Sequence, residues 1–106
     1  MVRKFAVEIP YDTLSDLCRR WQVAELALFG SVVRDDFSAG SDIDVLVSFL
    51  PEARWTILDE IRMEEEVSAV FGRRVELVPR RAVEQSQNPI RQKAILESAV
   101  SIYVAR

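Results

Sequence analysis

Two aspartates, Asp42 and Asp44, stand one residue apart at the start of an apolar, β-branched segment, 43–49 (IDVLVSF). Side chains alternate across a strand, so both carboxylates should point to one face while Ile43 points into a core. Two carboxylates on one face repel each other unless a cation lies between them. Magnesium takes one or two carboxylates and completes its shell with water and phosphate oxygens. The pair therefore predicts a metal site at the start of a strand.

A glycine and a serine, Gly30 and Ser31, follow an earlier apolar run at 23–29 (VAELALF). Glycine lets a ligand approach the backbone, and N–H groups exposed where a short helix begins near Ser31 favour an anion such as phosphate. The serine hydroxyl can donate to a phosphate oxygen, or it can simply cap the turn. A phosphate cradle beside metal-binding carboxylates is what metal-assisted phosphoryl or nucleotidyl transfer needs.

A third carboxylate, Glu76, lies in the centre of the segment 74–79 (RVELVP). Its two apolar neighbours share one strand face, so Glu76 points to the other. If this strand lies beside the two aspartates, Glu76 completes a two-metal site, in which one metal activates the attacking oxygen and the other the triphosphate. The alternative is a solvent-facing residue or an ion-pair partner for Arg73 or Arg74.

The composition limits the chemistry that is available. The chain has 106 residues, no histidine, a single cysteine (Cys18) and a formal net charge of −3. The absence of histidine removes Ser–His and Cys–His nucleophile pairs and most catalytic zinc sites. The single cysteine fits a reducing cytoplasm, and no apolar run approaches membrane-spanning length. The acidic balance argues against direct nucleic-acid binding, so we expect a cytoplasmic protein without membrane or nucleic-acid partners.

The hydrophobic periodicity predicts one small sheet with helices packed on it. We expect helices at 11–21, 54–71, 80–85 and 90–98, and strands at 23–29, 43–49 and 74–79. The segment 100–104 (VSIYV) is either an edge strand or the tail of the last helix. The fold class is therefore α/β or α+β, in a single domain over residues 1–106.

The spacing Gly30-Ser31, ten residues, then Asp42-Ile43-Asp44 resembles the signature of the polymerase-β-type nucleotidyltransferase superfamily. Within it, the chain most resembles the minimal nucleotidyltransferases, the MNT antitoxins that are paired with HEPN toxins. The likeness includes LALFGSVVRDDFSAGSDIDVLVSF and, later in the family's order, FGRRVELVPRRAV, NPIRQKAIL and AVSIYVA. It covers most of the chain, from about residue 14 to the C-terminus.

This resemblance implies a polymerase-β-like core that transfers a nucleotide from a triphosphate to an acceptor hydroxyl. Two Mg²⁺ ions and ATP are the implied cofactors, and the implied acceptor is a tyrosine of a helical HEPN toxin, a ribonuclease. In the assignment that follows, Gly30, Ser31 and Arg34 bind the nucleotide, and Asp42, Asp44 and Glu76 are the catalytic metal ligands. Arg34 can contact phosphate directly, or it can pair with Asp42 or Asp36 to close the loop.

The sequence departs from the family at two positions, since Glu76 stands where aspartate is usual and Asp35 where glycine is common. The extra methylene of Glu76 moves its carboxylate by roughly an ångström, and active sites respond to misplacement on that scale. Two functions therefore stay open. One is an adenylyltransferase antitoxin, and the other is a binding module of the same fold that blocks its partner with little or no catalysis. Retention of both aspartates favours the enzyme, because occlusion needs no paired carboxylates.

The basic segment 80–93 (RRAVEQSQNPIRQK) carries four cationic side chains. The simpler interpretation of such a run is a solvated surface. The more specific interpretation is a contact surface for a partner or a nucleotide.

Overall fold

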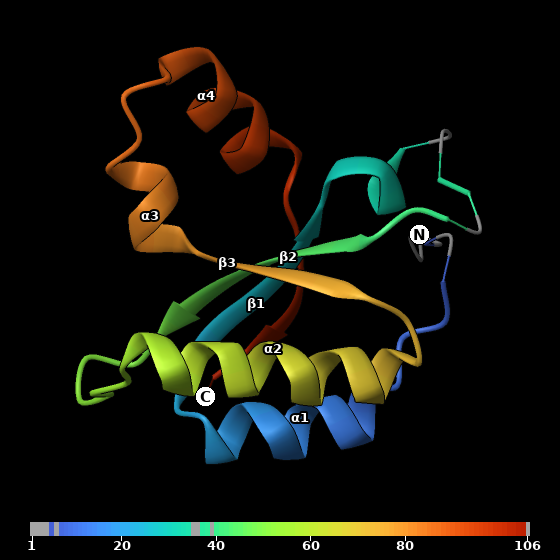
Figure 1. The fold of residues 1–106 in the computed structure, drawn as a ribbon, viewed down its shortest axis with the longest axis vertical. Helices are drawn as coiled ribbons and strands as arrows, with labels where there is room; N and C mark the ends of the chain where they lie inside the picture. Colours follow the sequence, from blue (N-terminus) through green and yellow to red (C-terminus); the bar gives the residue numbers. More distant parts are fainter. Residues whose placement is uncertain (1–4, 6, 35–36, 39, 106) are drawn as a thin grey trace.

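The computed structural model describes residues 5, 7–34, 37–38 and 40–105. It is a four-stranded mixed sheet with α1 and α2 on one face and α3 and α4 on the other (Figure 1). The elements in chain order are α1 (Tyr11–Arg20), β1 (Val23–Phe29), the 3₁₀ turn η1 (Gly30–Val33), β2 (Ile43–Phe49), α2 (Ile57–Phe71), β3 (Val75–Pro79), α3 (Arg80–Glu84), α4 (Pro89–Ser98) and β4 (Val100–Val104). The predicted fold class is confirmed.

The strand order is β3-β2-β1-β4. β1 pairs antiparallel with both β2 and β4, whereas β2 and β3 are parallel and are joined through α2. The segment 100–104, which the sequence left open between strand and helix, is the edge strand β4. The start of β2 therefore lies between η1, which follows β1, and the start of β3.

The face under α1 and α2 carries the larger hydrophobic core. Alternation along β2 sends Ile43, Val45 and Val47 to this side, where each is at most 1% exposed. Their partners from the two helices are Leu14, Leu17, Cys18, Met63 and Val67. Because the helical residues recur at three- and four-residue spacing, each helix presents one apolar stripe to the sheet.

The start of α2 is three residues later than the sequence predicted. Thr56 is the N-cap: its side chain accepts a hydrogen bond from the backbone N–H of Asp59, and the Asp59 carboxylate accepts one from the N–H of Thr56. This capping box defines the first turn, so residues 54–56 remain outside the helix. The helix ends at Gly72, whose φ of 67° is left-handed, as the glycine in the sequence predicted.

The face under α3 and α4 carries a smaller apolar cluster, built from Ala27, Phe29, Leu46, Val83 and Ile95. It lies along the middle of β1 and β2, where the sheet residues alternate with those of the larger core. Among the described residues, no helix combines the length and the apolar character needed to cross a bilayer.

Candidate active site

The parallel pairing of β2 and β3 places Asp44 directly opposite Glu76. Neighbouring positions on these strands point into the α1–α2 core, so alternation turns both carboxyl groups to the α3–α4 face. The charge of Glu76 therefore acts on the carboxyl group of Asp44. The expectation that the third strand brings Glu76 beside the aspartates is therefore confirmed for Asp44.

Gly30 packs against the carboxylate of Asp44. The antiparallel register sets Phe29 opposite Asp44, and the next residue, Gly30, turns away from the strand with a left-handed φ of 73°. A Cβ added at Gly30 would lie 2.3 Å from Oδ2 of Asp44. Two reasons favour glycine at this position. The left-handed backbone angle would strain any other residue, and a side chain would collide with the carboxylate of Asp44.

Ser31 and Arg34 follow in η1 and directly after it. The buried side chain of Val32 anchors the turn, and the backbone N–H of Arg34 donates to the carbonyl of Ser31 over 3.0 Å. Ser31 is half-buried, and within the described residues its hydroxyl has no hydrogen-bond partner. Arg34 is exposed, and its positive charge acts on Asp44. The turn thus offers one hydroxyl donor and one cation beside the carboxylates.

Burial and the neighbouring carboxylates raise the pKa of Asp44. Burial first, then the interaction with Glu76 and the charge of Asp42, together raise the pKa of this carboxyl from 3.8 to about 6. The charge of Arg34 opposes these effects. The ionised form of Asp44 is therefore disfavoured by its own surroundings, and a cation placed among the carboxylates would relieve the repulsion.

Two arginines just before β3 contact the segment that leads into β2, and one of them pairs with Asp42. Its Oδ2 lies 3.8 Å from Nε of Arg74, so the Arg74 pairing considered for Glu76 goes to Asp42 instead. Arg73 donates to the carbonyls of Ser38 and Ser41 over 3.0 and 3.1 Å and therefore ties down the loop that enters β2. Sequence reasoning did not find this clamp, because its acceptors are backbone atoms far away in the sequence.

The guanidinium of Arg73 also stacks 4.5 Å above the ring of Phe37. Asp35 and Asp36, at which the sequence comparison placed a family departure and a partner for Arg34, lie outside the described residues.

The residue types fit a divalent cation held by oxygen. In the described part of the chain, however, no three Asp, Glu or Cys side chains converge closely enough to hold one metal ion between them. Asp44 is engaged with Glu76, and Asp42 with Arg74, whose side chain is 84% exposed. An exposed ion pair is worth about 0–1 kcal/mol, so Asp42 can leave Arg74 at little cost. Three carboxylates around one strand end are the donor set that Mg²⁺ prefers.

A hollow of about 260 Å³ opens on this carboxylate cluster. Gly30, Arg34 and Asp44 line one side of it, and α4 lines the other with Arg91 and Ser98 among its residues. α4 therefore overlooks the site, which the sequence alone did not indicate.

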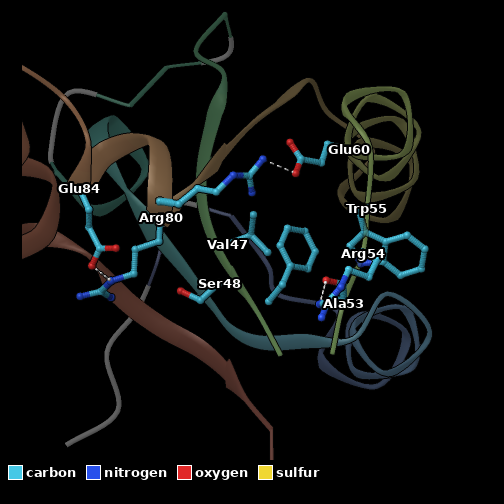
Figure 2. Close-up of a pocket in the computed structure, with 10 residues that line it drawn as sticks. Val47, Ser48, Ala53, Arg54, Trp55, Glu60, Arg80 and Glu84 are labelled. Atoms are coloured by element: carbon cyan, nitrogen blue, oxygen red, sulfur yellow. Dashed lines mark hydrogen bonds and ion pairs between the residues drawn. The ribbon is translucent and has the colours of Figure 1, made fainter. Parts of the chain in front are cut away.

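A larger hollow of about 510 Å³ lies at the opposite end of β2 (Figure 2). Two of its arginines are already paired with carboxylates, Arg81 with Glu60 over 2.6 Å and Arg80 with Glu84 over 3.3 Å, and Arg54 donates to backbone carbonyls. The chemistry-bearing residues are all at the other end of the strand, so we assign the site to the smaller hollow.

Comparison with known proteins agrees with this geometry. Residues 11–102 match the family model described as a nucleotidyltransferase domain. The chain belongs to this family. It is 41% identical over 63 residues to the protein adenylyltransferase MntA of Thermococcus cleftensis, a match that covers 59% of this chain and 62% of that relative. It is 31% identical to MJ0128 of Methanocaldococcus jannaschii, provisionally assigned as a protein adenylyltransferase, over 81% of this chain and 83% of that protein.

Solved structures share the fold of this nucleotidyltransferase. A toxin–antitoxin structure with AMP-PNP matches with a TM-score of 0.69 at 16% identity, over 92% of this chain and 76% of the other. The complex of a tri-AMPylated Shewanella oneidensis HEPN toxin with its MNT antitoxin matches with a TM-score of 0.61 at 15% identity, over 90% and 70% of the two chains. The expected membership of the minimal nucleotidyltransferases is confirmed.

Proposed function

We propose that this protein is a Mg²⁺-dependent protein adenylyltransferase that acts as an antitoxin. It moves AMP from ATP to a hydroxyl, we infer a tyrosine, of a HEPN-type toxin with which it forms a hetero-oligomer. The observation that carries the proposal is the packing of the Gly30 turn onto Asp44 with Glu76 in register on the next strand. Relatives named as adenylyltransferases and the AMPylated toxin bound to an antitoxin of this fold supply the reaction and the partner.

Each residue of the site has a role in this reaction. The backbone at Gly30 and the hydroxyl of Ser31 hold the phosphates, and Arg34 neutralises part of their charge. Asp42 and Asp44 would hold Mg²⁺, and Glu76 would be the third ligand. When bound, two such ions supply positive charge to the phosphates and to the attacking oxygen.

The acceptor hydroxyl oxygen forms a bond to the α-phosphorus, and the bond from that phosphorus to the bridging oxygen breaks. Pyrophosphate leaves. The hydroxyl proton passes to a carboxylate of the cluster. We infer that residues 1–106 act as a single catalytic domain and that the reaction takes place in the cytoplasm, where ATP is supplied.

A second candidate function is inhibition by binding with little or no catalysis. The observation that favours it is the longer Glu76 together with the lack of a converged metal-ligand group among the described residues. Glu76→Asp separates the two functions. If the protein is an enzyme, the shorter side chain should retain or raise transfer, and if it is a binder, transfer should be absent in both forms while inhibition persists.

The experiment that tests the proposed function is the intact mass of a HEPN-type toxin after co-expression with this chain. Mass steps the size of one AMP that appear with the native chain and vanish with Asp42→Asn would support the enzyme. Glu65→Gln, which removes one exposed carboxylate on α2 away from the site, is the matched control and should leave the steps intact. An unmodified partner that still co-purifies and is still inhibited would overturn the proposal in favour of the binder.

A further inference from the structure

We propose that Arg91 of α4 is a binding residue for the phosphate groups of the nucleotide, opposite the Gly30 turn. The inference rests on the proposed function and extends it to a helix that carries none of the residues assigned from the sequence signature. It follows from the position of Arg91 at the hollow, from its lack of an internal partner, and from the charge that the site must accommodate.

The backbone of α4 places Arg91 at the hollow. The side chain of Asn88 caps the helix by accepting a hydrogen bond from the backbone N–H of Arg91 over 3.1 Å. One turn later, Ile95 is buried in the smaller apolar cluster and lines the same hollow. Residues four apart lie on one helix face, so Arg91 and Ile95 share the face of α4 that borders this hollow and a second hollow toward α3. Asp44 and Gly30 line the opposite wall.

Arg91 differs from the other cations of the basic segment 80–93. Arg80 and Arg81 are paired with carboxylates, and Nζ of Lys93 lies 3.9 Å from Glu97. For Arg91, no hydrogen-bond or ion-pair partner of the guanidinium is found within the residues that the structure describes. An exposed arginine that lines a hollow without an internal partner is available to a ligand of opposite charge.

The charge at the site explains why a second arginine is needed. A nucleoside triphosphate brings several negative charges toward the three carboxylates Asp42, Asp44 and Glu76. Arg34 supplies positive charge from the side of η1, and Arg91 supplies it from the side of α4. A guanidinium suits this position, because its planar fork can donate two parallel hydrogen bonds to phosphate oxygens. With both arginines the phosphates are held between the turn and the helix.

The test measures equilibrium binding of ATP, AMP and adenosine to the purified chain in the presence of Mg²⁺ by calorimetry. Arg91→Ala should weaken ATP binding about ten- to a hundredfold, the loss of a hydrogen bond between charged groups. It should weaken AMP binding less and leave adenosine binding unchanged. Arg91→Lys should recover part of the ATP affinity, since it restores the charge without the fork. Lys93→Ala removes one positive charge from the same helix and should bind all three ligands as the native chain does.

The outcomes separate the failure of this inference from the failure of the proposed function. If the native chain binds ATP and modifies its partner, but Arg91→Ala binds ATP equally well, Arg91 is not a phosphate ligand and the proposed function stands. An equal loss for ATP and adenosine would also overturn the inference, because it would place Arg91 at the base or in the fold. If the native chain binds no nucleotide, both proposals fail. Arg91→Gln, with a similar length and no charge, replaces the alanine variant should that variant melt earlier than the native chain.

Discussion

The two faces of the sheet differ in what their side chains do. On the face under α1 and α2, Ile43, Val45 and Met63 belong to a continuous core and are fully buried. On the face under α3 and α4, the same strands present Asp44 and Glu76 beside a much smaller apolar cluster. Because side chains alternate along a strand, neighbouring residues of β2 serve opposite purposes. Stability is concentrated on one face, which leaves the other free to carry charges that weaken the fold.

Asp44→Asn is expected to have the largest effect on activity, and it tests the difference between the two faces of the sheet. Transfer to the partner should fall at least about a hundredfold, because a charged group at the reacting centre is lost. The metal-free variant should fold as well as the native chain or better, since the carboxylate repulsion is removed. Transfer is measured by intact mass and stability by thermal melting. A variant that failed to fold would show that Asp44 is needed for stability, which would contradict the assignment of Asp44 to the site.

The next effect compares one large apolar residue from each face. Met63→Ala should lower the free energy of unfolding by about 2–5 kcal/mol, because Met63 is fully buried in the larger core. Ile95→Ala should lie near the lower end of the same range, because Ile95 is 8% exposed and belongs to the smaller cluster. Urea unfolding of both variants measures the difference. Equal losses would contradict the unequal division of stability between the faces.

A smaller effect compares the two left-handed glycines. Gly72→Ala should cost about 1–2 kcal/mol, the price of a side chain in this backbone region, because nothing lies within 4 Å of the added Cβ. Gly30→Ala should cost more and should also impair transfer, because its Cβ would displace the Asp44 carboxylate. Thermal melting and the partner-mass assay on both variants test this. Similar costs with intact transfer would mean that Gly30 is only a turn residue.

The smallest expected effect is a pH dependence of stability that comes from Asp44, on the face under α3 and α4. The folded pKa of Asp44 is about 6 against an ordinary 3.8, so between these values the folded chain keeps a proton that the unfolded chain has released. The stability of the metal-free protein should therefore decrease as the pH rises through this window. Asp44→Asn should remove that part of the dependence. Melting temperatures of both proteins across this window give the comparison, and parallel curves would show that Asp44 titrates normally.

Much of the site could be predicted from the sequence because its signals are local. The alternation around Ile43 and around Glu76 predicted which side chains face away from the core, and the structure agrees. The start of α2 was predicted three residues too early, because composition in that segment favours helix while the Thr56 capping box sets the actual boundary.

The sequence by itself determined β1, β2 and β3, the Gly30 turn and the face on which each carboxylate stands, because a period of two residues and the absence of a Cβ act within a few positions of the chain. Only the tertiary structure decided that Asp44 lies opposite Glu76, that Arg74 pairs with Asp42, and that α4 brings Arg91 over the site. Strand register and helix docking depend on contacts between residues far apart in the chain, and their energies become defined only when the whole sheet is packed.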